Sequence, residues 1–188
     1  GPGSTARSPV RFGYAEYALI PPDRNRWEVL DGEFVMNPAP TSMHQTISRR
    51  LVRVLMAAVE DSDAGLVFNA PYDVILDAYT ILQPDLVIVS RARGSLISER
   101  GLEGAPDIAI EILSRNRAHD EVLKRALYER FAVPEYWMVD GDARLVTHLV
   151  LEEGRYRTHA HLRETDTLVS TLFDGALRLD LAPIFAPL

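Results

Sequence analysis

The sequence predicts an α/β (α+β) domain with a central mixed β-sheet flanked by helices. Apolar runs of strand length alternate with two segments of helical periodicity, and hairpin turn signals lie near both ends of the ordered chain. The runs at 80–90 and 105–114 are almost wholly apolar, which is typical of central strands covered on both faces. The 188 residues are enough for one domain with a substantial core.

The N-terminal part divides into a lead-in and a hairpin. Residues 1–22 begin with the remnant of an expression vector, GPGS, and continue as a polar, proline-containing and loose lead-in, so the domain is predicted over 23–188. Between the apolar runs of RWEVLDGEFVM, Asp31-Gly32 is a strong signal for a two-residue turn. In that register Glu28 and Glu33 lie on the same face of the ribbon.

Two segments have the pattern of amphipathic helices. The first has Ser42 as its predicted N-cap, with Gln45 three residues later, followed by apolar residues at helical spacing from Ile47 to Val59. The second helix is predicted within 117–133 and ends before Pro134. Its predicted apolar face consists of Leu123, Ala126, Leu127 and Phe131, with Val122 beside it.

The remaining segments read as strands. Residues 65–77, 80–90 and 105–114 form three strand-like runs, and another follows the second helix as PEYWMVD. A hairpin turning at Glu153-Gly154 and a tail of short apolar pieces complete the chain.

Composition limits the classes of function. The net charge of -7 and the pI near 5.2 argue against a large passive nucleic-acid surface, although not against an enzyme that meets a phosphodiester through a bound metal. The absence of cysteine excludes disulfides and thiolate metal sites, and fits a cytoplasmic protein. No apolar run is long enough to span a membrane.

Carboxylates inside the apolar runs are the most informative feature. By the period of two, Asp85 shares a face with Ile81, Gln83, Val87 and Val89, and Glu111 shares one with Asp107 and Ala109. Burying an unpaired carboxylate costs several kcal/mol, so each acid needs an arginine, a lysine or a metal ion. Two acids on adjacent strands suit Mg²⁺ or Mn²⁺. The alternative for Glu111 is a salt bridge to an arginine.

Lys124 is the only lysine among the 20 basic residues. One explanation is a compositional bias toward arginine, with a surface pair to Asp120 one helical turn away worth only about 0.3–0.5 kcal/mol. The other is that this position needs a compact ammonium on a flexible stem, which a planar guanidinium does not replace.

The ordered motifs resemble a known family. WEVLDGE, QPDLVIVS, GAPDIAIEILS and HDEVLKRALYERFAVPEYWMVD occur in the order found in the Uma-type restriction-endonuclease-like proteins of the PD-(D/E)XK nuclease superfamily. The resemblance implies a helix–three-strand–helix–strand core and a divalent-metal phosphodiesterase site. Asp85 and Glu111 would be the metal ligands. Leu113 stands where the superfamily carries its strand lysine, and the following helix offers Lys124 in its place.

Further candidates accompany this central set. Glu33, in the DGE motif, and His44, at the start of the first helix, are candidate catalytic residues. Their structural alternatives are an edge-strand charge and a helix-end hydrogen bond. The secondary candidates are Asp73, Gln83, Asp107, Glu28 and Tyr128.

These observations predict a Mg²⁺- or Mn²⁺-dependent endonuclease acting on DNA, working as a homodimer. One alternative is a nuclease-derived binding or regulatory module with a degraded site, suggested by the acidic charge and the missing strand lysine. The other is a metal phosphodiesterase acting on RNA or small nucleotides.

Overall fold

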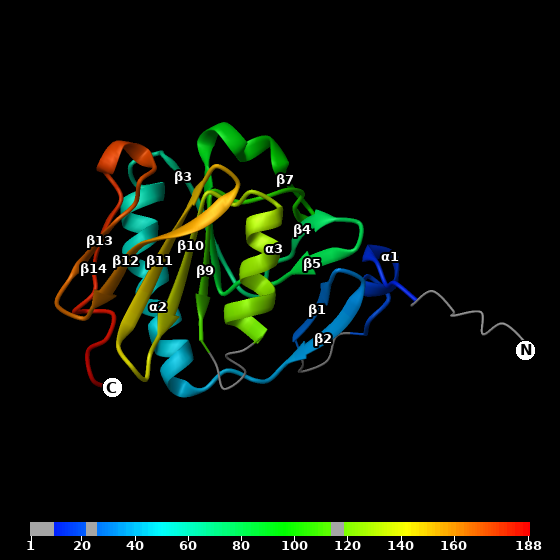
Figure 1. Cartoon of the computed structure of the whole chain (residues 1–188), viewed down its shortest axis with the longest axis horizontal. Coiled ribbons are helices and arrows are strands. Elements are labelled where there is room, and N and C mark those ends of the chain that lie inside the picture. Colours follow the sequence, from blue (N-terminus) through cyan, green and yellow to red (C-terminus); the bar gives the residue numbers. More distant parts are fainter. Residues whose placement is uncertain (1–9, 22–25, 114–118) are drawn as a thin grey trace, which may run out of the picture.

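Two mixed six-stranded β-sheets form the framework of the computed structural model, which describes residues 10–21, 26–113 and 119–188 (Figure 1). The predicted α+β class is confirmed, but the described strands divide between two large sheets instead of forming one. The active-site candidates lie where these sheets adjoin, so the division matters for function.

The first sheet holds the N-terminal hairpin. Its order is β2 (Glu33–Asn37), β1 (Arg26–Leu30), β5 (Thr80–Leu82), β4 (Val74–Asp77), β8 (Gly101–Leu102) and β7 (Ile97–Ser98). Asp31 and Gly32 adopt φ of 49° and 88°, the left-handed conformation that a tight hairpin turn needs. The predicted register is confirmed, because Glu28 pairs with Val35 and Leu30 pairs with Glu33.

The second sheet holds the apolar central strands. Its order is β12 (Arg155–Arg163), β11 (Leu145–Glu152), β10 (Glu135–Asp140), β9 (Ile108–Ile112), β6 (Leu86–Ser90) and β3 (Gly65–Asn69). Strand β10 runs parallel to β9 and the other pairs are antiparallel. All five residues of β9 are buried, as its apolar composition predicts.

Few helices accompany the sheets. They are α1 (Tyr14–Tyr17), α2 (Ser42–Leu55) with a π-helical continuation (Met56–Glu60), and α3 (Arg125–Arg130), which follows a π-helical turn (His119–Lys124). Short 3₁₀ turns cover Arg91–Leu96 and Phe173–Gly175, and β13 (Thr167–Val169) pairs with β14 (Arg178–Asp180). No helix in the described ranges is long and apolar enough to cross a membrane.

Helices α2 and α3 cover opposite faces of the second sheet (Figure 1). Leu51 of α2 belongs to the same core cluster as Ile110 of β9, whereas Leu127 of α3 packs in the cluster that contains Ala109. Because side chains alternate along a strand, Glu111 points to the face that α3 covers.

The predicted face of the second helix is partly wrong. Leu127 is buried, but Val122 and Leu123 are 63% and 50% exposed and Ala126 is also exposed. The helix instead turns Lys124 inward, where the residue is only 2% exposed. The apolar periodicity of the helix did not predict this orientation, because the side chain buried at this turn is a lysine.

The start of α2 also differs from the prediction. Thr41, not Ser42, is the N-cap, and its hydroxyl accepts a hydrogen bond from the His44 backbone N–H at 3.2 Å. The shift by one residue leaves the buried stripe as predicted, with Ile47 and Leu51 in the core.

Two predicted strands are each divided between the sheets. The run at 65–77 contains β3 and β4, and the run at 80–90 contains β5 and β6. The second break falls at Pro84, which has no N–H for a sheet ladder. Asp85 therefore precedes β6 and shares a face with Val87 and Val89, while Ile81 belongs to the first sheet and Gln83 lies in the connection after β5.

The predicted lead-in carries local structure in its described part. The Phe12 N–H donates to the Gly32 carbonyl at 2.8 Å, and the Tyr14 N–H donates to the Ala78 carbonyl at 2.9 Å. Tyr14 and Tyr17 pack against a small apolar cluster of the first sheet. These contacts hold residues 12–17 on the sheet that carries Glu28.

The buried acid Glu135 joins the C-terminal segment to the second sheet. Glu135 is fully buried, and its Oε1 contacts His148 Nε2 at 2.6 Å and accepts from Trp137 Nε1 at 3.0 Å. Its Oε2 accepts from the Ser170 hydroxyl at 2.9 Å and from the Thr171 N–H at 2.7 Å. Burial raises the pKa of Glu135, but these donors outweigh it and lower the pKa to about 2.

Candidate active site

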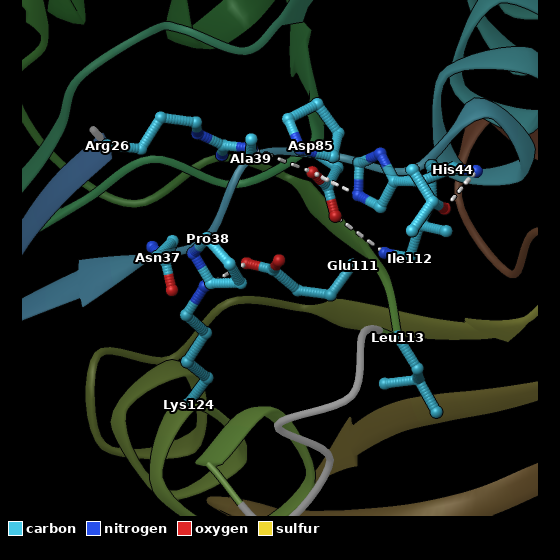
Figure 2. Close-up of a pocket in the computed structure, with 12 residues that line it drawn as sticks. Arg26, Asn37, Pro38, Ala39, His44, Asp85, Glu111, Ile112, Leu113 and Lys124 are labelled. Atoms are coloured by element: carbon cyan, nitrogen blue, oxygen red, sulfur yellow. Dashed lines mark hydrogen bonds and ion pairs between the residues drawn. The ribbon is translucent and has the colours of Figure 1, made fainter. Parts of the chain in front are cut away.

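A cavity of about 320 Å³ brings the main sequence-predicted residues together (Figure 2). Asp85, Glu111, Lys124 and His44 all line it, and Arg26 joins them from the start of β1. The two sheets, α2 and the segment before α3 all contribute, so residues distant in sequence share one space.

Strand pairing places the two acids next to each other. Leu86 of β6 pairs with Ile110 of β9, and continuing this antiparallel register sets Asp85 opposite Glu111. Directly opposed residues have Cβ atoms about 5 Å apart and side chains on the same face. Both carboxylates therefore line the same cavity.

Asp85 is held by donors from three directions. Its Oδ2 accepts from the Ile112 N–H at 2.7 Å, and its Oδ1 lies 3.1 Å from His44 Nε2 and 3.4 Å from Arg26 Nη1. Burial raises the pKa of Asp85, but the contacts with His44, Arg26 and Ile112 outweigh it and hold the pKa below its usual value. The carboxylate is thus ionised at neutral pH.

Lys124 bridges two buried carboxylates. Its Nζ lies 3.1 Å from Glu28 Oε1 and 3.3 Å from Glu111 Oε1, and Figure 2 shows Lys124 and Glu111 pointing toward each other. Glu111 Oε1 also accepts from the Tyr128 hydroxyl at 2.7 Å. Burial and the Glu111 charge raise the pKa of Tyr128 well above its usual value, so the phenol keeps its proton and donates.

This geometry favours the explanation that position 124 needs a compact ammonium on a flexible stem. A surface pair with Asp120 would leave the ammonium in solvent, whereas Lys124 is buried against Glu28 and Glu111. The Asp120 side chain lies outside the described residues. In Figure 2 Leu113 points away from Asp85, and the cation of the cavity wall comes from Lys124 on the helix side.

Glu28, which the sequence analysis ranked as a secondary candidate, contacts Lys124 behind the cavity wall. It is fully buried, and its Oε2 accepts from the Gln83 N–H at 2.7 Å, while Asn37 Nδ2 donates to its Oε1. Its position in the middle of an apolar strand, beside Val29 and Leu30, was the signal that could have identified it.

Glu33 lies apart from this group. It is exposed at the turn end of β2, where it pairs with Leu30. It is two residues from Val35, the partner of Glu28, which is about 7 Å along the strand. Within the described part of the chain, Glu33 does not line the cavity.

The other secondary candidates have structural contacts. Asp107 lies before β9, at the opposite end of that strand from Glu111, and its Oδ2 accepts from the Ser90 N–H at 2.6 Å. Asp73 Oδ1 accepts from the Tyr17 hydroxyl at 2.6 Å and from Gln83 Nε2 at 3.0 Å. These contacts link Asp73 and Gln83 to Tyr17 of α1, and neither residue lines the cavity within the described part of the chain.

Arg26 was missed by the sequence analysis. Its Nη2 donates to the Gln83 carbonyl at 2.6 Å, and its Nη1 reaches Asp85. A cation two residues before Glu28 lies on the same face of β1, and this spacing could have indicated its role.

The donor set fits one hard divalent cation. Asp85 and Glu111 offer oxygen ligands from adjacent strands, and Mg²⁺ commonly takes one or two carboxylates and leaves its other positions to water and phosphate. Among the described residues no group of three or more His, Cys, Asp or Glu side chains is arranged as a metal site. Asp85 and Glu111 are the two described carboxylates on the cavity wall that could hold such an ion.

The fold and the family of the chain follow from comparison with known proteins. The fold is similar to that of a solved "putative nuclease belonging to DUF820" from Anabaena variabilis ATCC 29413, with a TM-score of 0.74 and 21% sequence identity over 93% of this chain and 98% of that chain. The chain belongs to the Uma2 family, described as "Putative restriction endonuclease", whose model matches residues 14–182. No curated protein sequence matches it. The predicted family and restriction-endonuclease-like fold are thus confirmed, and family and fold together indicate a nuclease.

Proposed function

We propose that this protein is an endonuclease that hydrolyses phosphodiester bonds of DNA with the help of Mg²⁺ or Mn²⁺. The observation that carries the proposal is the opposition of Asp85 and Glu111 in one cavity, with the ammonium of Lys124 3.3 Å from Glu111. Buried acids and a buried cation in a cleft are the arrangement expected of a catalytic site.

Asp85 and Glu111 would hold the metal ion. When bound, such an ion polarises a phosphoryl oxygen and lowers the pKa of a bound water. His44, Arg26 and the Ile112 N–H keep Asp85 ionised and fix its orientation, so the ligand is prepared before any ion arrives.

Lys124 acts on the reacting groups as a hydrogen-bond donor. Glu28 and Glu111 hold its Nζ at the cavity wall. From there it orients the attacking water and offsets the negative charge that grows on the phosphate. The water oxygen forms the new bond to phosphorus and the water releases a proton to solvent, while the bond from phosphorus to one sugar oxygen breaks and that oxygen takes up a proton from solvent.

The test is cleavage of supercoiled plasmid DNA in Mg²⁺ or Mn²⁺. Asp85→Asn should lower the rate at least about a hundredfold, because it removes a charged ligand. Asp107→Asn is the matched control, since Asp107 lies at the other end of the same strand pair and asparagine still accepts the hydrogen bond from Ser90. Equal cutting by wild type and Asp85→Asn would refute the proposal.

A second candidate is a nuclease-derived binding or regulatory module. It is favoured because Arg26 and Lys124 already place positive charge against Asp85 and Glu111, and His44 Nε2 lies 3.1 Å from Asp85 Oδ1. Calorimetry with Mn²⁺ separates the two functions: millimolar binding that Asp85→Asn abolishes favours the enzyme, and no binding favours the module. A panel of DNA, RNA and small nucleotides tests the choice of substrate.

The proposal includes a homodimer, because cutting both strands of a duplex commonly uses two sites. It also includes a cytoplasmic location, which the lack of cysteine fits. Sedimentation equilibrium of the intact chain tests the dimer. A monomer at working concentration would leave each molecule to cut one strand, and plasmid nicking would then exceed linearisation.

A further inference from the structure

A second cavity adjoins the candidate active site. Its volume is about 480 Å³, and its wall shares Arg26, Pro40, His44 and Asp85 with the first cavity. The two spaces therefore meet at Asp85, one toward Lys124 and the other along α2. A phosphodiester reacting at Asp85 has a nucleotide on each side, and the two cavities provide a space for each.

One face of α2 lines this second cavity. Gln45, Ser48, Arg49 and Val52 all belong to its wall, and their spacing of three, one and three residues places them on the same helix face. The core-facing residues of α2, such as Leu51, lie on a different face. The helix thus presents polar groups to the cavity without disturbing its packing.

The wall carries an excess of positive charge. Arg26 and Arg49 face a single carboxylate, that of Asp85, whose charge already interacts with His44, Arg26 and the Ile112 N–H. Arg49 is exposed, and no carboxylate of the described chain forms an ion pair with it. The Arg26 Nε is buried and has no acceptor among the described residues. In a protein of net charge -7, such a local excess favours an anionic ligand.

The remaining wall suits the uncharged part of a nucleotide. Pro40, Pro71 and Val52 offer apolar surface for a sugar or a base, while Asn69 adds an amide. The volume lies within the range of about 300–1,000 Å³ that is usual for small-molecule sites.

We propose that the second cavity binds the nucleotide adjacent to the reacting phosphodiester, with its phosphate held by Arg49 and Arg26. This inference rests on the proposed function and extends it, because it assigns to α2 the part of the nucleic acid strand that is not being cut. Planar guanidinium groups suit this task, since they form paired hydrogen bonds to phosphate oxygens.

The experiment measures binding of a fluorescein-labelled single-stranded DNA oligonucleotide, and of the RNA of the same sequence, by fluorescence anisotropy in Ca²⁺ buffer at several salt concentrations. Arg49→Gln is the test variant, because Arg49 is exposed and glutamine is a good helix former. Arg157→Gln is the control, since Arg157 is exposed on the edge strand β12, three strands from β9.

Arg49→Gln should weaken binding about tenfold, the usual loss for one hydrogen-bonded charged contact. It should also make the negative slope of log association constant against log salt concentration shallower by about 0.7, the value for one phosphate contact on a single strand. Arg157→Gln should change neither quantity. An effect of Arg49→Gln on DNA alone, RNA alone or both supports the subsite and identifies the strand it accepts.

Equal affinity and slope for Arg49→Gln and Arg157→Gln would overturn the inference, as would a lack of binding by wild type. The proposed function is judged separately by plasmid cleavage and Asp85→Asn. Cleavage that depends on Asp85, combined with no effect of Arg49→Gln, removes the subsite and leaves the nuclease.

Discussion

Replacing Lys124 by methionine tests the buried charge cluster most directly. Methionine has a similar length and fills the same space, so the change removes the ammonium with little loss of packing. Glu28 and Glu111 then remain buried next to each other, at 0% and 2% exposure, without the cation that separates them.

The expected loss of stability is large. Removing one partner of a buried ion pair costs about 3–5 kcal/mol, because an uncompensated charge stays behind. For a chain of this length each kcal/mol lowers Tm by about 2–4 °C, so Lys124→Met should melt about 6–20 °C below wild type. Urea denaturation followed by circular dichroism measures the same difference at constant temperature.

Two further variants make the result specific. Val122→Met changes an exposed residue of the same helical turn and should stay within about 0.5 kcal/mol of wild type. Adding Glu28→Gln and Glu111→Gln to Lys124→Met removes all three charges and should recover much of the lost stability. A Lys124→Met protein as stable as Val122→Met would refute the view that the ammonium compensates both carboxylates.

Three other outcomes are expected. Glu135→Gln should cost about 3 kcal/mol at pH 7, because the folded-state pKa of Glu135 is about 2 against the usual 4.5; this stability is present above pH 4.5 and is lost as the pH falls toward 2, so acid titration of both proteins should show their curves converging there. Tyr128→Phe should lower stability by about 1.5–3 kcal/mol in urea denaturation, since it removes a buried hydrogen bond to the charged Glu111, and an unchanged midpoint would contradict that bond. Glu33→Gln should alter plasmid cleavage less than about twofold, because Glu33 is exposed outside the cavity; a loss comparable to that of Asp85→Asn would place it in the site after all.

Much of the site could be predicted from the sequence because its residues conflict with their surroundings. Asp85 and Glu111 are acids in apolar segments, and burial forces such acids to find cations. The Asp31-Gly32 turn fixed the face of Glu28 through local geometry alone, and the structure has the same register.

Other features depend on contacts that no local pattern contains. Lys124 was counted as polar in a search for apolar periodicity, so the buried face of its helix was assigned to exposed residues such as Leu123. The burial of Glu28 instead of Glu33 depends on which pair of the hairpin lies against Gln83, in the connection between β5 and β6. Pro84 predicts a break in the strand, because proline has no N–H for a sheet ladder. No local pattern predicts that the chain enters a different sheet after this break.

The change of sheet at Pro84 makes the cavity a coupling point between the two sheets, in addition to the apolar clusters that they share. Glu28 belongs to the first sheet and Glu111 to the second, and both contact the same ammonium. Any ligand that favours this arrangement also favours one relative position of the two sheets. Conversely, a change in the relative position of the sheets changes the affinity for the ligand. Ligand binding should therefore slow hydrogen exchange in β1 and β9 together, while loosening the N-terminal hairpin should weaken binding at acids that it does not itself carry.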